Sequence, residues 1–371
     1  MTITPILQFG TSRFLQAHAD LFVSDALVKG EALGPITVVQ SSGEAARGRR
    51  LQALAAPDGF PVRVEGIEAG RPVQRVERVT SIRRGLSTAN DWPEIVRIAA
   101  EEAEIILSNT SDAGWVPQRE DNEPGFHQAM SYPAKLTQLL LARFREGGRR
   151  LTVMPTELVA RNGDTLRRRV LELARPLVPG LADWIAENVI FANSLVDRIV
   201  SEPIEPAGAV AEPYALWAVE EQPGLVLPCR HAALTQVSDL DRIERLKLHI
   251  LNLGHSYLVA GWLAEGGAGS PLVRERLADP AVRADLESLY DREVLPVFAE
   301  AGYGDAAGYV ATTLDRFANP FLAHRLSDIA QNHAEKLHRR IGAFLQWGVA
   351  LGVAAPQPRL RQVLATTERV S

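Results

Sequence analysis

The sequence contains a single cysteine, Cys229, among its 371 residues. One thiol excludes an internal disulfide and a cysteine-based metal cluster, and it is typical of a chain in a reducing cytoplasm. A net charge of −5 gives no excess of positive charge, so it does not favour nucleic acid as a partner. We therefore expect a cytoplasmic protein that binds no nucleic acid.

Long hydrophobic runs are also missing. The N-terminus, MTITPILQFG, lacks the basic region and long apolar core of a secretory signal. The longest apolar segment, IGAFLQWGVALGVAA, contains Gln346 and is too short to span a bilayer. These absences predict a protein without a membrane partner, although its apolar content of 46% is enough to build the cores of two domains.

Strands alternate with helices in the first half of the chain. A short apolar run ends at Gly10, a helical period continues to Gly30, and ITVVQ forms a second strand. Similar pairs continue to about residue 205, which predicts a mostly parallel, doubly wound, Rossmann-like sheet. Helical periodicity dominates later. We therefore predict a dinucleotide-binding α/β domain over residues 1–205 and a mostly α-helical substrate-binding and catalytic domain over 206–371.

A glycine follows the first strand directly, as the tight turn of a dinucleotide fold requires. The usual G-x-G-x-x-G pattern is absent, because Ser12 stands where the second glycine would be. The turn therefore indicates either an ordinary strand-to-helix connection or a cofactor site. The candidate cofactor residues of this turn are Gly10, Thr11, Ser12, Arg13 and Phe14.

Two more strand ends bear on the cofactor. The second strand ends at Gln40-Ser41-Ser42, where an acid for the ribose of NAD is expected. An arginine of the following segment can bind the 2′-phosphate of NADP, or it can simply begin a solvated helix. The residues therefore do not decide between NAD and NADP. These arginines are Arg47, Arg49 and Arg50. A third polar turn, formed by Ser108, Asn109 and Thr110, either borders the cofactor or caps the next segment.

The stretch RIERLKLHILNLGHSYLVAG, residues 242–261, places ionisable groups in an apolar helix. At about 100° per residue, Glu244 lies about 60° from Lys247, His255 about 80° and Asn252 about 140°. A lysine in apolar surroundings can act as a general base, and amide donors can hold a developing oxyanion. The alternative is a partly buried helix whose lysine reaches solvent by its tip.

Several segments together resemble the polyol-specific long-chain dehydrogenases, the mannitol dehydrogenase family. They are ILQFGTSRFLQAHADLF, ILSNTSDAGW, YPAKLTQLLLARF, PTELVARNGDTL, NSLVDRIVSEP, KLHILNLGH and RFANPFLAHRLSDIA. The resemblance runs through almost the whole chain in the same order, and the K-x-x-x-x-N-x-x-H element is its specific part. It implies a dehydrogenase that uses NAD and no metal.

The resemblance also implies roles for single residues. Lys247 matches the catalytic base, Glu244 its proton relay, and His255 a substrate contact. Asn252 and Asn162 match the asparagines that bind the reacting oxygen. An active-site aspartate and a late lysine correspond to Asp197 and Lys336. A substrate carboxylate needs a cation, so Lys336 and Arg339 are predicted to bind it.

Within the family, VVQSSG, EPYALWAVE and AHRLSDIAQNHAEKLHRR resemble the altronate oxidoreductase (tagaturonate reductase) branch. Asn332-His333 stands where the mannitol and mannonate branches usually have Asp-Gly. We expect an altronate/tagaturonate-like substrate, with mannitol, mannonate or a polyol phosphate as the alternative, and a non-catalytic nucleotide-binding sensor as the alternative of another class. NAD is the expected cofactor, with NADP open, and the sequence leaves monomer or dimer open.

Overall fold

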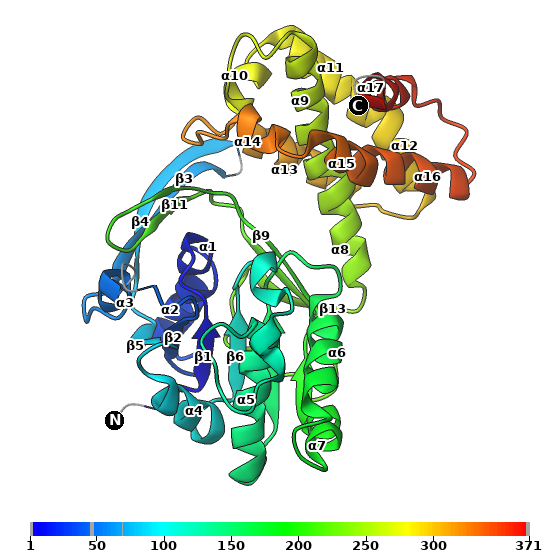
Figure 1. Cartoon of the computed structure of the whole chain (residues 1–371). Helices are drawn as coiled ribbons and strands as arrows, with labels where there is room; N and C mark the ends of the chain where they lie inside the picture. The colour runs from blue at the N-terminus through cyan, green and yellow to red at the C-terminus, as the bar shows by residue number, and fades with distance from the viewer. Residues whose placement is uncertain (1–2, 45–47, 69, 369–371) are drawn as a thin grey trace. The chain divides into compact units, whose positions relative to one another are not determined.

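The computed structural model describes residues 3–44, 48–68 and 70–368 (Figure 1). The chain divides into two compact units, the first containing residues 1–64 and 74–240 and the second containing 65–73 and 241–371. We predicted a boundary after residue 205. The observed division falls later, because three short strands between residues 209 and 237 pair with each other or with strands of the first unit.

A six-stranded parallel sheet forms the centre of the first unit, in the order β5-β2-β1-β6-β7-β8. Counted within the sheet, this is the 3-2-1-4-5-6 order of dinucleotide-binding folds, which confirms the predicted doubly wound sheet. The strands are β1 (Ile6–Phe9), β2 (Ile36–Gln40), β5 (Ile82–Ser87), β6 (Ile105–Ser108), β7 (Leu151–Pro155) and β8 (Val189–Phe191).

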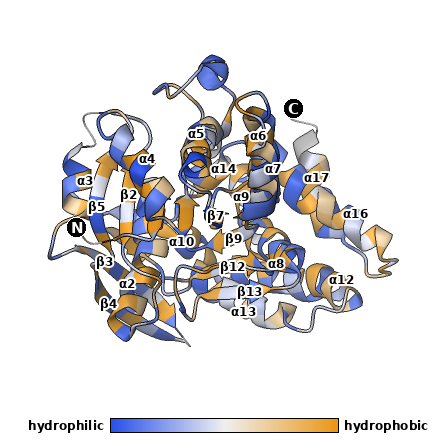
Figure 2. Ribbon diagram, turned by 90° about the horizontal axis from the view of Figure 1, so that it is seen from below, coloured by the Kyte–Doolittle hydropathy of each residue, from blue (hydrophilic) through white to orange (hydrophobic). Residues whose placement is uncertain are grey.

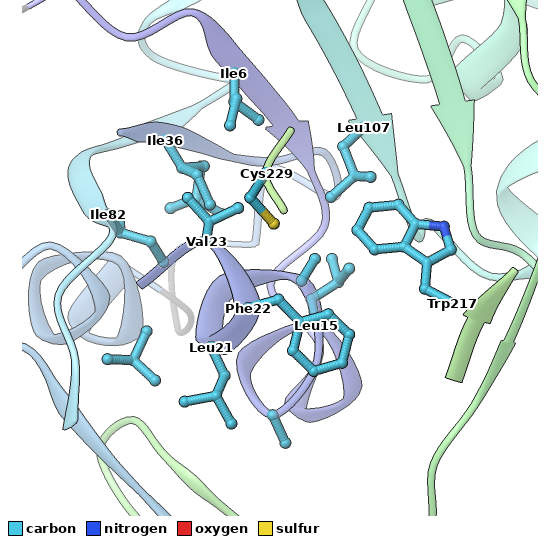
Figure 3. Close-up of a cluster of buried hydrophobic side chains, with 14 of the residues drawn as sticks. Ile6, Leu15, Leu21, Phe22, Val23, Ile36, Ile82, Leu107, Trp217 and Cys229 are labelled. Atoms are coloured by element: carbon cyan, nitrogen blue, oxygen red, sulfur yellow. The ribbon is translucent and has the colours of Figure 1, made fainter. Parts of the chain in front are cut away.

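Successive side chains of the central strands enter two different cores, one on each face of the sheet. Ile6 joins the cluster shown in Figure 3, which includes Phe22 and Trp217. Leu7 and Phe9 join the cluster of the opposite face. The helices that cover that face carry both hydrophobic and hydrophilic residues, as the colours of α4 and α7 in Figure 2 show. These helices are α4 (Trp92–Glu101), α5 (Tyr132–Arg145), α6 (Asn162–Ala174) and α7 (Leu181–Asn188).

Further helices and two smaller sheets complete the first unit, although residues 65–73 of β3 and β4 belong to the second unit. The single helix expected after Gly10 is two helices, α1 (Arg13–Gln16) and α2 (Ala19–Lys29), and α3 covers Gly48–Leu54. Two short 3-10 turns, η2 (Asp112–Trp115) and η3 (Arg119–Asn122), precede α5. Smaller sheets have the orders β10-β11-β3-β4 and β13-β12-β9. Their strands are β3 (Phe60–Glu68), β4 (Arg71–Val79), β9 (Ser194–Asp197), β10 (Val200–Pro203), β11 (Ala209–Ala211), β12 (Leu216–Glu220) and β13 (Leu234–Val237).

The second unit is mostly helical, as predicted. Its α-helices are α8 (Leu240–Leu246), α9 (Leu253–Ala264), α10 (Val273–Leu277), α11 (Pro280–Leu289), α12 (Leu295–Glu300), α13 (Ala306–Phe317), α14 (Leu326–Ala330), α15 (His333–Leu337), α16 (Ala343–Ala350) and α17 (Pro358–Glu368). Three π-helical turns interrupt them, η4 (Lys247–Asn252), η5 (Tyr290–Val294) and η6 (His338–Gly342). Within the described residues, no helix has both the length and the apolar character needed to cross a membrane.

Candidate functional site

The turn after β1 is built around a glycine that no other residue can replace without strain. Gly10 has a φ of +124°, and a Cβ atom there would lie 2.5 Å from the carbonyl oxygen of Asn109. Its N–H donates to the carbonyl of Val39 at 3.0 Å. The carboxyl ends of β1, β2 and β6 therefore meet at this turn, which is where open α/β sheets bind their ligands.

Side-chain hydrogen bonds tie the first turn to the turn after β6. Ser12 caps α1 by accepting from the N–H of Leu15, and its hydroxyl donates to Asn109 Oδ1 at 3.1 Å. Asn109 in turn donates through Nδ2 to the carbonyl and hydroxyl oxygens of Thr156, at 3.2 and 3.1 Å. These bonds hold the two predicted cofactor turns together as one rigid edge.

A buried carboxylate, which we did not predict, organises the turn after β6. Glu157 accepts from the N–H and hydroxyl of Thr110, at 2.8 and 3.0 Å, and from the hydroxyl of Ser108 at 3.0 Å. Burial raises the pKa of Glu157, although these hydrogen bonds act in the opposite direction. Its position in PTEL after β7 gave no signal of this role, because the contact spans 47 residues of sequence.

A cavity of about 640 Å³ lies along this edge, entirely within the first unit. Six of its lining residues were predicted to bind cofactor: Gly10, Thr11, Ser12, Ser41, Asn109 and Thr110. The other ten were not: Gln40, Ser42, Arg50, Ser111, Gly114, Gln128, Ala129, Met130, Tyr132 and Lys135. Hydroxyl groups, amides and two cations therefore face the cavity, a donor set that suits a phosphate-bearing ligand.

Three further predicted cofactor residues are not among the lining residues. The guanidinium of Arg13 lies 3.8 Å from the carboxylate of Glu205, and the ring of Phe14 stacks on His18 with 4.7 Å between centroids. The Ser108 hydroxyl is used by Glu157. Their binding roles stay predictions. Of the predicted arginine cluster, Arg50 lines the cavity, Arg49 is exposed, and Arg47 lies outside the described residues.

In the second unit, Lys247 and Asn252 are the first and last residues of the π-helical turn η4. The N–H of Leu253 donates to the carbonyl of Leu248, five residues earlier. Residues five apart lie nearly above one another when hydrogen bonds join i to i+5. A uniform α-helical rotation was therefore wrong here, and Asn252 lies closer to the face of Lys247 than the expected 140° separation.

Two partners from other segments stabilise this π-turn. The Tyr290 hydroxyl of η5 donates to the carbonyl of Ile250 at 2.9 Å, and Arg340 of η6 donates to the carbonyl of Asn252 at 3.3 Å. A Cβ atom on Gly254 would lie 2.0 Å from the Tyr290 hydroxyl, so only glycine leaves room for this bond. Such interruptions of α-helices occur frequently at functional sites.

His255 lies in a buried, cation-rich part of the second unit. Its ring contacts Phe317 and His324, with centroid distances of 4.3 and 4.8 Å. Burial, and then the charges nearby, lower the pKa of His255 well below its usual value, and burial lowers that of His324 to about 4. Both rings are therefore neutral near pH 7. Among the described residues, His255 Nε2 is buried and has no hydrogen-bond partner.

The cations near His255 come from α13, α15 and η6. Arg316 is buried, and Lys336 donates to the carbonyl of Ile329 at 2.8 Å. Burial and the neighbouring Arg340 lower the pKa of Lys336, while burial and Arg339 lower that of Arg340 to about 10. Arg339, predicted to bind substrate, is itself exposed. Arg316 and Arg340 were not predicted, because only the folded helices bring them toward His255.

Glu244, the predicted proton relay, lies half-buried in α8, one turn before Lys247. Two other predicted residues belong to the first unit, where Asp197 is a buried residue at the end of β9. Asn162 is also buried, and its amide donates to the carbonyls of Pro155, Glu157 and Ser194 while accepting from two backbone N–H groups. In this arrangement Asn162 joins β7, α6 and β9, and its contact with a reacting oxygen stays a prediction.

No three His, Cys, Asp or Glu side chains gather as metal ligands would in the parts of the chain that the structure describes. Two sets of side chains stand out, each within one unit. One set lines the cavity of the first unit, and the other surrounds the π-turn of the second unit.

Comparisons with solved structures agree with this fold. D-sorbitol dehydrogenase in its substrate-free form superposes with a TM-score of 0.82, covering 94% of this chain and 76% of that chain at 20% identity. Pseudomonas fluorescens mannitol 2-dehydrogenase, in a ternary complex with NAD and D-mannitol, gives a TM-score of 0.76, covering 98% and 78% at 22% identity. At these identities the likeness concerns the fold.

Sequence comparisons extend over both units. Altronate oxidoreductase of Bacillus subtilis (strain 168) is 31% identical over 361 residues, which cover 90% of this chain and 73% of that protein. The altronate oxidoreductase of Halalkalibacterium halodurans is 29% identical, over 91% and 69% of the two chains. Residues 4–225 match the mannitol dehydrogenase Rossmann domain, and residues 239–366 match the mannitol dehydrogenase C-terminal domain. The chain belongs to the mannitol dehydrogenase family.

Proposed function

We propose that this protein is an NAD(P)-dependent oxidoreductase that interconverts a secondary alcohol and a ketone on a sugar acid or polyol. Altronate and tagaturonate are the favoured pair, because relatives matched over nine-tenths of the chain are named altronate oxidoreductases. The observation that carries the chemistry is the π-turn that begins at Lys247 and ends at Asn252. NAD, whose binding the cavity of the first unit suits, supplies the acceptor for the hydride.

Lys247 is proposed as the general base. In its neutral form it takes the hydroxyl proton of the alcohol as the carbinol carbon loses its hydride, which leaves a ketone and a protonated lysine. The reverse reaction returns the proton from Lys247 to the carbonyl oxygen. Glu244, one helical turn earlier, is proposed to pass the proton between Lys247 and solvent.

Asn252 and His255 are proposed to orient the reacting oxygen. The Asn252 amide donates to the oxygen on which negative charge develops, a role also proposed for Asn162. His255 carries a buried Nε2 without a partner among the described residues, and a substrate hydroxyl can form a hydrogen bond with it. Its neutral ring can accept a hydrogen bond without adding charge beside the lysine.

Cations of the second unit are proposed to bind the acidic end of the substrate. Arg316, Arg340 and Lys336 each act electrostatically on His255; Arg316 is buried, whereas Lys336 and Arg340 are half-buried. A substrate carboxylate beside these cations would be stabilised by charge-assisted hydrogen bonds. Asp197 and Arg339 stay in the proposal as further substrate contacts. This set favours a sugar acid over mannitol, the neutral alternative.

A substrate panel tests the proposal. Tagaturonate, fructuronate, fructose and fructose 6-phosphate are each incubated with NADH or NADPH, and loss of absorbance at the nicotinamide band is followed. Tagaturonate is expected to react fastest. Fastest turnover of fructuronate, fructose or fructose 6-phosphate supports the mannonate, mannitol or polyol phosphate alternative, respectively. Cofactor binding without turnover on any substrate supports the sensor, and absence of binding contradicts the oxidoreductase altogether.

A further inference from the structure

The end of strand β2 lacks the acid that usually binds the ribose of NAD and excludes the phosphate of NADP. Its place is taken by Gln40, Ser41 and Ser42. Among the described lining residues of the cavity there are two cations, Arg50 and Lys135, and no carboxylate. This end of the cavity is therefore suited to an additional negative charge.

Lys135 comes from the first turn of α5 and is only 4% exposed. Its Nζ donates to the carbonyl of Ser41 at 3.1 Å, and Gln128 donates to the same carbonyl at 3.0 Å. Burial lowers the pKa of Lys135 to about 8, because the ammonium group loses hydration. The side chain is thus anchored at the end of β2 but spends only one of its three donors there.

Asp121, the carboxylate that acts electrostatically on Lys135, is already bound to other residues. Asp121 raises the pKa of Lys135 only in part. It accepts from the N–H and hydroxyl of Ser131, each at 2.8 Å, and lies 3.1 Å from the guanidinium of Arg169. A buried ammonium without a hydrogen-bonded carboxylate is costly, so an anionic ligand beside Lys135 would lower that cost.

Arg50 approaches the same end of the cavity from α3. Its guanidinium lies 3.8 Å from the carboxylate of Glu205, which is longer than a hydrogen bond, and its side chain is 28% exposed. Arg50 therefore keeps donors for a ligand. An arginine near the end of the second strand is the group that accommodates a 2′-phosphate in dinucleotide folds.

We propose that this cavity binds NADP(H) as well as NAD(H), and that Lys135 and Arg50 hold the 2′-phosphate of the adenosine ribose. The proposal rests on the proposed function, because it places a dinucleotide in the cavity of the first unit. Gln128 completes the ribose site. Its Oε1 is buried and has no partner in the described part of the chain, so it can accept from the ribose hydroxyl that both cofactors share.

Calorimetric titration of the full chain tests the proposal without turnover. Adenosine 2′,5′-bisphosphate and adenosine 5′-monophosphate differ only in the 2′-phosphate, so the ratio of their affinities reports this site, and NADPH and NADH provide the matching pair of cofactors. The variants are Lys135→Met and Arg50→Gln. Lys29→Met is the matched control, because Lys29 is an exposed lysine of α2 that does not line the cavity.

The native chain should bind the bisphosphate at least about tenfold more tightly than the monophosphate. One or more charge-assisted hydrogen bonds to the 2′-phosphate account for a difference in affinity of this size. Each cavity variant should lower that ratio about tenfold and leave monophosphate affinity nearly unchanged, and Lys29→Met should keep the native ratio.

Circular dichroism shows whether each variant folds. If Lys135→Met misfolds, Arg50→Gln, at a half-exposed position, still tests the proposal. Equal native affinities, or unchanged ratios in the folded variants, overturn the proposal. A native chain that binds neither NADH nor NADPH contradicts the proposed function as well.

Discussion

Lys247 is the residue on which the proposed chemistry depends most. Lys247→Ala removes the general base, so alcohol oxidation should fall about 10²–10⁴-fold and lose the pH dependence that the lysine contributes. Cofactor affinity should persist, because the cavity lies in the other unit. Asn252→Ala should lower the rate without moving the pH profile, since an amide does not titrate. The pH–rate profiles of both variants decide the matter, and near-full turnover of Lys247→Ala would show that the helix is only structural.

Lys336 tests recognition of the acidic end of the substrate. Its Nζ is held by the carbonyl of Ile329, near a second cation, Arg340. Lys336→Met should raise KM for a uronate about tenfold, the order expected for a lost charge-assisted hydrogen bond, and should change KM for a neutral polyol much less. Steady-state kinetics with one substrate of each kind measures the two effects. Equal changes in both would argue against carboxylate binding by this residue.

Asp20 predicts how stability depends on pH. The side chain is fully buried in α2, and burial raises its pKa from 3.8 to about 7. Well below pH 3.8 the carboxyl is neutral in both the folded and unfolded chains. As the pH rises through 3.8 towards 7, mainly the unfolded chain ionises, so the native free energy of unfolding should fall, by up to about 4 kcal/mol.

Asp20→Asn should remove this loss. The variant should unfold at a higher denaturant concentration than the native chain at pH 8, and the difference should be much smaller near pH 4. Denaturant titrations at both pH values measure it. A difference of the same size at both values would mean that packing, and not ionisation, separates the two side chains.

At the residue scale, the sequence predicted what local patterns encode. Gly10 was predictable because a glycine directly after an apolar strand signals a tight turn, and its positive φ agrees. Glu157 and Lys135 were not predictable, because their partners, Thr110 and Ser41, lie 47 and 94 positions away. Such contacts follow from strand order in the sheet, which the spacing of residues does not reveal.

At the scale of elements, the π-turn η4 is the feature that sets the geometry of the proposed catalytic residues. Gly254→Ala places a Cβ atom 2.0 Å from the Tyr290 hydroxyl, so either Tyr290 or the turn must move. The variant should lose kcat strongly and lose some stability. Tyr290→Phe, which removes the bond to the Ile250 carbonyl, should cost about 1 kcal/mol of stability and a smaller part of kcat.

A double-mutant cycle separates crowding from other causes. Without the Tyr290 hydroxyl, an added Cβ atom meets fewer close atoms, so Gly254→Ala should be less harmful in the Tyr290→Phe background than in the native one. Thermal unfolding and kcat of all four proteins provide the comparison. Additive effects would place the damage elsewhere, for example at Phe317, whose ring edge lies 3.1 Å from the same position.

The existence of a long apolar helix around Lys247 was predictable, because hydrophobic periodicity extends through it. The π-turn was not, because one additional residue per turn leaves no mark in composition. The later domain, predicted as mostly α-helical, also contains the irregular segment 319–325. There Pro320 disfavours a helical Asn319, whose side chain instead accepts from the N–H of Phe321 and donates to the carbonyl of Glu65.

At the scale of the whole molecule, a bound dinucleotide should stabilise the first unit. At 100 times the dissociation constant, a ligand specific for the folded state adds about 2.7 kcal/mol. Hydrogen exchange should show protection with NADH around residues 10–12 and 109–111, which line the cavity. Peptides of α7, outside the lining, serve as the internal control. Protection of α7 alone, or of no peptide, would contradict a cofactor site at this edge.

The two-unit organisation was largely predictable, because alternating strands and helices give way to continuous helical periodicity. The position of the boundary was not. Strands β11, β12 and β13 are short and follow a proline-broken stretch, and β12 pairs in parallel with β13 and antiparallel with β9, so no regular period marks them. Only the pairing partners, known after folding, assign residues 206–240 to the first unit.

The π-turn also accommodates one residue more than an ordinary α-helix would place in the same stretch. If residues 247–252 formed an ordinary α-helix of the same length, Asn252 would lie about 140° from Lys247, on another face. Deleting one residue between the two would instead leave them four positions apart, and residues four apart lie on the same face of an α-helix. In evolutionary terms the turn behaves as a one-residue insertion that leaves the faces of the flanking helices in register.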